Sequence, residues 1–548
     1  MASSSDRRDD GPTPLALARA RLAVASGKQK LDLIFSAPDP RAFVRGLPAE
    51  DLYFAVREVG LADAADVVGL ASPAQFRAFV DLDAWSHDRL DGARVLAWLR
   101  LAREGAPTPA EFRLLRLGLD LDLLVLVLKT QTSIHALEEE PDPVLTSDNW
   151  VRSAEGKYLI EITATGDDGA TARQLIEDFI DENPFEATRL FEAVRWELES
   201  ELEESCLRWR QGRVRDLGFP ALEEALAIWR PLPDGWRPRE VAPDAGRVSG
   251  VPALLLAGRT RALFLDRVAE ELPDEARGAF NEGLVYLLNC ALVADGIDPK
   301  DLDLARSSLA AARDTLSLGL ELSSGGEPGR ALAVLVSTPP VELFRVAVTR
   351  LLDVQREADR AARPLLFGSG AQVALDTPDA ETLAGLRRKR LRLFEGADWR
   401  PLRDRADLDR AVETIARARQ AAAVLAGIGI DPARASELAE QAGRAPTAIS
   451  ASQLALTAAV RTTLELTALG PLTAEDLKEV GRLFDGEKLS GSARAGLERF
   501  FDERAPAATP VTREWVARLE AELGPPLARG GLDARFVEVI LVAPGSYP

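Results

Sequence analysis

Residues 47–83, LPAEDLYFAVREVGLADAADVVGLASPAQFRAFVDLD, contain the start signals of three successive short helices. Pro48 at a first helical position, with Glu50 and Asp51 in the first turn, predicts the first helix, because unpaired amide groups and the helix dipole favour anions there. Gly60 supplies the permissive backbone that commonly ends a helix. Since helices this short are marginal alone in water, each must bury its apolar stripe on its neighbours. The stretch therefore predicts a stack of short helices.

Two further helices follow within the same stretch. A brief helix is expected at about 63–70, and Ser72 and Gln75 then form a capping box around a proline at the first helical position. Phe76 and Phe79 come next with helical spacing and are predicted to form the buried face. The connections between these helices are very short, as in stacked helical repeats.

Residues 47–83 resemble the N-terminal superhelical domain of MgtE magnesium transporters and the related helical domains of flagellar switch proteins. The resemblance implies a superhelix of short helices, and it implies nothing about activity. Residues 195–232, 288–322 and 339–358 resemble a bacterial family known only as a domain of unknown function. That resemblance spans most of the chain and implies no activity for any residue.

Length and composition predict a mainly α, multi-lobed protein with a minor β component. A chain of 548 residues exceeds what one hydrophobic core usually serves. Most of it reads as helix, whereas 157–166 and 536–545 are predicted strands because of their β-branched content. Polar and Pro-rich breaks divide the chain. The expected parts are a disordered tail at 1–12, a helical superhelix at 13–137, a small α+β lobe at 144–235 and a helical C-terminal region at 245–548.

The sequence favours a cytoplasmic protein without membrane insertion. The first dozen residues are polar and charged, unlike a signal peptide. The most apolar run, 117–128, carries Asp120 and Asp122 and is shorter than the ~20 residues that a bilayer requires. The net charge of −20 disfavours nucleic acid and anionic membranes as partners. Cys206 and Cys290 are expected to be buried free thiols, because two cysteines in so long a chain form no disulfide framework.

Residues 81–91 gather Asp81, Asp83, His87, Asp88 and Asp91, which could hold a divalent cation. The same residue types are common helix caps, and the spacing matches neither HExxH nor the EF-hand loop. We therefore interpret them as structural.

The other histidine and the glycine-rich segment give no catalytic signal. His135 is expected at a helix end without an acid or thiol partner, which favours a structural role. The segment 368–373, GSGAQV, lacks the third glycine of a dinucleotide fingerprint, and the sequence contains neither a P-loop nor a GxSxG elbow. A nucleotide-dependent enzyme and a serine hydrolase are both disfavoured.

Glu197, Glu201 and Glu204 are predicted on one helical face, where they could chelate a cation or receive a basic partner. Arg208 stands four residues after Glu204, the spacing of an exposed ion pair, so solvated charge is the favoured interpretation.

A basic run could instead grip phosphate, RNA or an acidic protein surface; its members are Arg387, Arg388, Lys389, Arg390 and Arg392. Aromatic residues do not interleave it, so pairing with carboxylates of the chain itself is favoured over nucleic acid.

Two hypotheses about function follow. The first is a helical scaffold without catalytic activity, cofactor or metal, which binds an unidentified protein partner. The alternative is a carboxylate-based enzyme or a divalent-cation (magnesium) sensor, since 87 acidic residues provide many pairs that could converge in space. No complete ligand or catalytic spacing supports the alternative, so the scaffold is preferred, with no residue assigned to a catalytic, cofactor or metal site.

Overall fold

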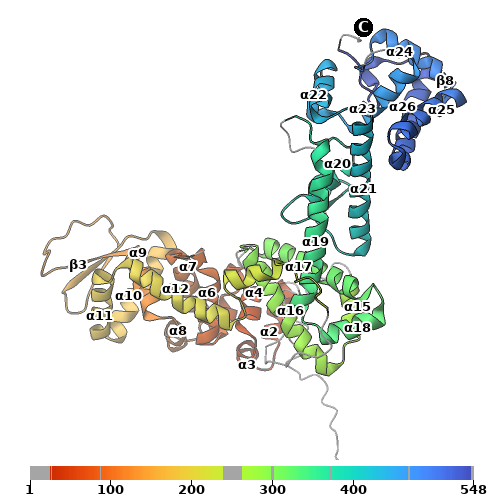
Figure 1. Cartoon of the computed structure of the whole chain (residues 1–548). Helices are drawn as coiled ribbons and strands as arrows, with labels where there is room; N and C mark the ends of the chain where they lie inside the picture. Colours follow the sequence, from red (N-terminus) through yellow and green to blue (C-terminus); the bar gives the residue numbers. More distant parts are fainter. Residues whose placement is uncertain are drawn as a thin grey trace, which may run out of the picture. The chain divides into compact units, whose positions relative to one another are not determined.

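The computed structural model describes residue 25 and residues 27–86, 88–237, 262–297, 301–368, 373–466 and 469–544 (Figure 1). Most of these residues are helical, and the strands among them form a three-stranded sheet and two-stranded hairpins. The prediction of a mainly α protein with a minor β part is therefore confirmed. The tail predicted at residues 1–12 lies outside the described residues.

The chain divides into two compact units. The first comprises Met1–Arg230, Gly235–Leu316 and Glu327–Phe344, and the second comprises Pro231–Asp234, Ser317–Gly326 and Arg345–Pro548. The three lobes expected from the sequence are a different division, and their boundaries stay predictions.

The first unit begins with the short helices that the sequence predicts. The bounds are α2 Gly27–Phe35, α3 Pro40–Arg45, α4 Ala49–Val59, η1 Leu61–Asp63, α5 Ala65–Leu70, α6 Pro73–Asp83, β1 Trp85–Ser86, β2 Arg89–Leu90, α7 Gly92–Gly105, α8 Pro109–Arg116 and α9 Leu121–Gln131. The predicted capping box is present, because the backbone amides of Ser72 and Gln75 each donate to the other residue's side chain. The Gln75 side chain also donates to the carbonyls of Val44 and Leu47, at 2.9 and 2.8 Å. Pro48 is the residue before α4, so this helix begins one residue later than predicted.

Two glycines allow α5 and α7 to approach each other backbone to backbone. A Cβ atom on Gly69 would lie 1.9 Å from the carbonyl oxygen of Gly105, and one on Gly105 would lie 1.7 Å from the carbonyl oxygen of Ala65. Any side chain at either position would overlap the facing helix. The close contact of these two helices therefore depends on both glycines.

A three-stranded antiparallel sheet follows α9, in the order β3-β5-β4. Its strands are β3 Thr132–Ala136, β4 Trp150–Arg152 and β5 Tyr158–Ile162. The strand predicted at 157–166 is thus confirmed as β5, whose Ile160 and Ile162 are fully buried. The sequence did not predict β3, which pairs along its whole length with β5.

Helices make up most of the remaining described residues of the first unit, and two of them, α17 and α19, contribute residues to both units. The bounds are α10 Gly166–Glu182, α11 Pro184–Trp196, α12 Glu199–Asp216, α13 Leu222–Leu226, η2 Ala227–Trp229, α15 Phe264–Glu270, α16 Asp274–Ala294, α17 Leu302–Ser324, α18 Pro328–Ser337 and α19 Pro340–Ala362. Cys206 in α12 and Cys290 in α16 are free and buried, as predicted. Burial raises the pKa of Cys206 to about 12 and that of Cys290 to about 11, so both stay protonated thiols at neutral pH.

The second unit continues after α19 with helices and two more hairpins. The bounds are η3 Arg363–Leu365, α20 Asp379–Leu386, β6 Arg392–Glu395, β7 Asp398–Pro401, α21 Arg405–Gly427, α22 Pro432–Gln441, η4 Pro446–Ala448, α23 Ala451–Thr463, α24 Ala474–Val480, η5 Gly481–Leu483, β8 Phe484–Asp485, β9 Lys488–Leu489, α25 Gly491–Arg504, η6 Pro506–Ala508, α26 Thr509–Ala528 and η7 Ala534–Phe536. Its core includes Phe501, Val516 and Leu519, which are almost completely buried.

Three hairpins are each followed by a helix with a side-chain N-cap. Each of β1–β2, β6–β7 and β8–β9 precedes a helix whose N-cap side chain accepts a hydrogen bond from a backbone amide of the first turn. The capping residues are Asp91, Asp404 and Ser490. The cap satisfies an amide that the helix itself leaves unpaired, so each hairpin is coupled to a well-defined helix start.

The strand predicted at 536–545 is wrong for its described part, 536–544. Val539, Ile540, Leu541 and Val542 are buried in succession, without the alternation of a half-buried strand. The backbone is held both by α23, whose Thr457 hydroxyl accepts from the Leu541 amide at 2.8 Å, and by Leu472, whose amide donates to the Leu541 carbonyl at 2.8 Å. This segment makes one isolated parallel bridge, so its β-branched content reflects burial rather than sheet formation.

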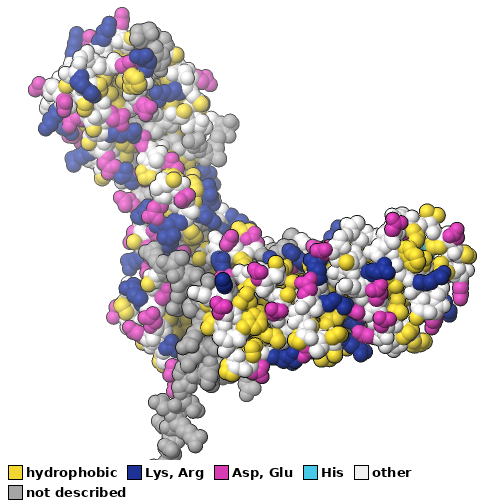
Figure 2. Space-filling view, turned by 180° about the vertical axis from the view of Figure 1, so that it is seen from behind, with side chains coloured by type: hydrophobic (Ala, Val, Ile, Leu, Met, Phe, Trp, Pro, Cys, Tyr) yellow, Lys and Arg dark blue, Asp and Glu magenta, His cyan; other side chains and the backbone are white. Residues whose placement is uncertain are grey.

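The most apolar run of the sequence lies largely in α9, whose residues 123–128 are buried. Among the described residues, no single helix is long and apolar enough to cross a membrane, although one bent pair, Pro328–Ser337 with Pro340–Leu365, meets that test by length and composition. On the face drawn in Figure 2, acidic and basic side chains are interspersed with exposed hydrophobic ones. The local charge on this face therefore does not follow from the net charge of the chain.

Candidate functional site

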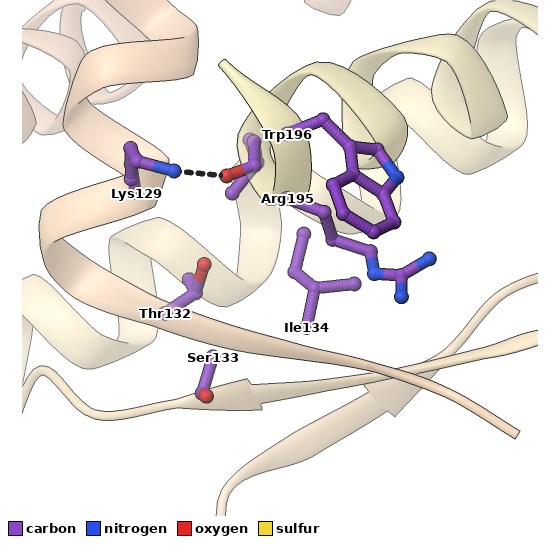
Figure 3. Close-up of a pocket in the computed structure, with 7 residues that line it drawn as sticks. Lys129, Thr132, Ser133, Ile134, Arg195 and Trp196 are labelled. Carbon is purple, nitrogen blue, oxygen red and sulfur yellow. Dashed lines mark hydrogen bonds between the residues drawn. The ribbon is translucent and has the colours of Figure 1, made fainter. Parts of the chain in front are cut away.

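A hollow of about 280 Å³ lies in the first unit between β3 and the last turn of α11 (Figure 3). The residues that line it are Lys129, Thr132, Ser133, Ile134, Val194, Arg195 and Trp196. Thr132 and Ile134 extend toward α11, whereas Ser133 extends from the opposite side of the strand (Figure 3). The strand follows α9 without a loop, and this direct connection places β3 beside α11.

The two cations of the hollow are already paired. The Lys129 ammonium donates to the carbonyl of Val194 at 2.7 Å. The Arg195 guanidinium donates to Glu139 at 2.7 Å and to Glu192 at 3.3 Å. Burial alone would lower the pKa of Arg195, but these two carboxylates outweigh it and raise the pKa. The hollow is therefore not a free anion site.

Glu192 ties the end of α11 to the sheet. It accepts hydrogen bonds from the hydroxyl of Tyr158, the indole N–H of Trp196 and the guanidinium of Arg195. The hydrogen bond from Tyr158 is the largest contribution, and together with the others it lowers the pKa of Glu192. Desolvation and the same carboxylate raise the pKa of Tyr158 to about 12. This side of the hollow is thus held in place by one ionised carboxylate.

Two large apolar side chains are exposed at and just after the end of α11, and the first of them, Trp196, lines the hollow. Trp196 is 66% exposed and Leu198, in the short link to α12, is 59% exposed. The Arg195 guanidinium lies 5.0 Å from the centre of the Trp196 ring and supports it from one side. The indole is oriented by Arg195 and Glu192 and still presents apolar surface to solvent.

The opposite face of β3 carries His135, and the structure corrects the prediction for this residue. This residue lies in the strand rather than at a helix end, and its ring contacts Glu140 at 3.2 Å and Glu161 at 3.4 Å. Burial opposes ionisation of Glu161, but hydrogen bonds from Thr146, Ser147 and His135 prevail and lower its pKa. Sequence spacing could not reveal Glu161 as a partner, because it lies on a different strand.

The carboxylates of residues 81–91 do not converge on one point. Asp81 accepts from Arg213 at 2.7 and 2.9 Å, whereas Asp83 accepts from Tyr53 and Trp98. Asp91 caps α7, and His87 lies outside the described residues. In the part of the chain that the structure describes, no group of three or more His, Cys, Asp or Glu side chains could hold a metal ion.

The predicted acidic face is wrong in one position. Glu197 follows α11 as its C-cap residue, whereas Glu201 and Glu204 lie in α12, so the three do not share a helix. The predicted pair of Glu204 with Arg208 is confirmed at 3.5 Å, with both side chains exposed.

The basic run ends at the β6–β7 hairpin, and several of its members have partners within the chain; Arg392, for example, donates to the carbonyl of Trp399 at 3.4 Å. Arg387 pairs with Asp359 at 3.0 Å, which agrees with the preferred interpretation. The Arg388 guanidinium lies 4.1 Å from the ring centre of Trp399, an aromatic partner that sequence spacing missed because it comes from β7. Residues 369–372 of the glycine-rich segment lie outside the described residues.

Sequence reasoning also missed the hollow itself. Its residues come from the contiguous segment 129–134, at the end of α9 and in β3, and from residues 194–196 at the end of α11, which lie far from it in the sequence. The one local signal was an exposed tryptophan at the end of an amphipathic helix, next to a leucine in an acidic segment. Such a signal indicates a surface contact but not where its second side lies.

The comparisons with known proteins give a family without an assigned activity. A family model described as "Family of unknown function (DUF6178)" matches residues 7–543. No curated protein and no solved structure matches the chain.

Proposed function

Because this chain belongs to the DUF6178 family of unknown function, no activity can be carried over from the family, and from the chain's own surface we propose a cytoplasmic helical scaffold that acts by binding another protein. The observation that carries the proposal is the hollow between β3 and α11, with Trp196 exposed in its lining and Leu198 exposed just after the end of α11. Tryptophan in such a setting is typical of the residues that dominate protein–protein binding energy.

The chemistry around the hollow also favours binding over turnover. Lys129, Arg195 and His135 all have partners within the chain, so these groups position their surroundings. A general acid or base would instead need to face an open site with its proton available. The surface offers apolar area bordered by charge, which suits a protein partner.

The short helices at the N-terminus fit the same proposal. Their resemblance to the MgtE N-terminal domain concerns architecture, and stacked helices commonly present extended binding surfaces. Function follows from the site rather than from the fold, so this support is an analogy.

Affinity purification of the full chain from its native cell at physiological salt, followed by mass spectrometry, tests the proposal. We expect a partner that is recovered in a fixed ratio, and its recovery should fall at least tenfold for the double variant Trp196→Ala/Leu198→Ala. Phe536→Ala is the matched control, because Phe536 is an exposed aromatic residue of the second unit and should leave recovery unchanged.

Two other results would contradict the scaffold. Recovery of the chain alone, together with turnover in a substrate screen that disappears when one carboxylate is replaced by its amide, would favour the carboxylate-based enzyme. A saturable response to magnesium would favour the cation sensor.

A further inference from the structure

We propose that the open edge of β3 receives an extended, basic segment of the partner protein, which adds to the sheet as a fourth strand. This inference rests on the proposed function and specifies its site and the chemistry of its partner. It is carried by three features: the outward backbone groups of Ile134 in β3, the hollow beside the strand, and the exposed carboxylates that follow β3 and Trp196 in the sequence.

The register determines which backbone groups of β3 point away from the sheet. The Leu137 amide donates to Lys157, and the Thr163 amide donates to Gln131. Opposed residues of an antiparallel pair alternate between bonded and non-bonded. The odd-numbered residues of β3 therefore bond to β5, and Ile134, which opposes Ile160, directs its N–H and C=O outward.

The outward groups of Ile134 have no backbone or side-chain partner among the described residues. The hollow touches Thr132, Ser133 and Ile134 in succession. Because the side chains of consecutive strand residues point to opposite faces, a space that touches all three borders the strand's edge. An incoming strand would thus find both a donor and an acceptor at Ile134.

The turn after β3 limits the length and position of the added strand. The carbonyl of Ala136 already accepts from the amides of Glu139 and Glu140. The ion pair of Arg195 with Glu139 connects α11 to the turn after β3 and closes that end. An added segment can therefore pair with only a few residues centred on Ile134, and its neighbouring apolar side chain can pack on Ile134 and Trp196.

Charge selects a basic segment. Exposed acidic residues follow both β3 and Trp196 in the sequence; they are Glu138 and Asp142 after β3, and Glu197, Glu199 and Glu201 after Trp196. The cations that line the hollow, Lys129 and Arg195, are paired within the chain. Lysine or arginine flanking the apolar residue of the partner would meet these carboxylates.

A synthetic peptide probe tests the inference directly. Fluorescein-labelled Lys-Val-Lys-Val-Lys-Val should bind the full chain saturably in fluorescence polarisation, and its affinity should fall as salt is raised. Glu-Val-Glu-Val-Glu-Val should bind at least tenfold more weakly. Methylation of the valine amides of the basic peptide should also weaken binding at least tenfold, because it removes the donors that a strand requires.

Two sets of variants test the protein side. Ile134→Pro removes the outward N–H and fills the edge, while the bonds of Ser133 and His135 to β5 remain, and proline is tolerated on edge strands. It should abolish peptide binding, whereas Ile134→Val should not. Glu138→Lys/Glu197→Lys should weaken the basic peptide, whereas Glu413→Lys/Glu440→Lys, the same charge change on exposed residues of the second unit, should not.

The outcomes separate this inference from the proposed function. Equal binding of the methylated and unmethylated peptides, or no binding of the basic peptide to the folded chain, would overturn strand addition at β3. If the cellular partner is nevertheless recovered in a fixed ratio and is kept by Ile134→Pro, the scaffold stands and its binding site lies elsewhere. If Ile134→Pro does not fold, the methylated peptide alone decides the question.

Discussion

At the scale of single residues, Asp83 shows how a carboxylate that the sequence marks as a possible metal ligand becomes a structural group. Its side chain is fully buried and accepts from the Tyr53 hydroxyl at 3.1 Å and the Trp98 indole at 2.9 Å. The guanidinium groups of Arg57 and Arg94 lie 3.5 and 3.2 Å from it. All its oxygen atoms are thus used within the chain.

Asp83→Ala should destabilise the first unit strongly. The substitution removes a buried carboxylate that the Tyr53 hydroxyl, the Trp98 indole and two guanidinium groups contact, and breaking a buried charged network in this way costs about 3–5 kcal/mol. Urea unfolding monitored by tryptophan fluorescence measures the loss. Asp88→Ala, at an exposed position of the same segment, is the control and should change the free energy of unfolding by no more than about 0.5 kcal/mol. A similar small effect for both would show that the Asp83 network contributes little.

Glu161 predicts a dependence of stability on pH. Its folded-state pKa lies below the ordinary value of 4.5, so ionised Glu161 stabilises the folded state above pH 4.5. That contribution is lost as the pH falls through the lowered pKa. Glu161→Gln should therefore lose less stability than the unmodified chain when urea unfolding is compared at successive pH values below 4.5.

The matched control for Glu161 is Glu155→Gln, an exposed carboxylate in the turn between β4 and β5. Its stability profile should run parallel to that of the unmodified chain. Parallel profiles for Glu161→Gln as well would mean that the hydrogen bonds from Thr146 and Ser147 do not distinguish the two protonation states.

At the scale of elements, the contact of α5 with α7 depends on the absence of two side chains. Each helix brings a glycine to the crossing point, and each glycine faces a carbonyl of the other helix. Glycine ordinarily weakens a helix relative to alanine, so its presence at both positions indicates that the close packing outweighs that loss.

Gly69→Ala should consequently destabilise the first unit, although alanine is the better helix former. The added Cβ would lie 1.9 Å from the carbonyl of Gly105, and the resulting overpacking costs about 1–3 kcal/mol. Gly212→Ala in α12 is the control, since its Cβ would meet nothing within 4 Å, and it should stabilise by about 0.5–1 kcal/mol. Urea midpoints of the two variants should move in opposite directions; a shift in the same direction would refute this account of the crossing.

At the scale of the whole molecule, divalent cations should have little effect on stability. A ligand stabilises a protein only if it binds the folded state in preference to the unfolded one. Of the carboxylates that the sequence offered as ligands, Asp81 is taken by Arg213, Asp83 by Tyr53 with Trp98, and Asp91 by the first turn of α7. No group of three or more His, Cys, Asp or Glu side chains among the described residues could hold a metal ion.

Millimolar magnesium or calcium should therefore shift the thermal unfolding midpoint by no more than about 1 °C, since binding at or below its dissociation constant adds very little free energy. A scan in EDTA supplies the baseline. A large, saturable rise with magnesium would reverse the conclusion and favour the cation-sensor alternative.

Several features could be predicted from the sequence because they depend on residues close together in the chain. The capping box of Ser72 with Gln75 and the ion pair of Glu204 with Arg208 join residues three or four positions apart, where helix geometry alone decides the contact. The mainly α fold and strand β5 follow from similar local patterns. Local periodicity was sufficient in these cases.

Only the tertiary structure decided where side chains and strand edges meet. His135 lies in a strand because β5 supplies the partner, and Trp399 reaches Arg388 because a hairpin folds back. Residues 536–544 are buried without forming a sheet because their backbone bonds to α23 and to Leu472. The open edge of β3 is likewise a property of strand order and register. Such contacts depend on packing between segments distant in the sequence, which hydrophobic burial drives without regard to local pattern, so no short stretch of sequence specifies them.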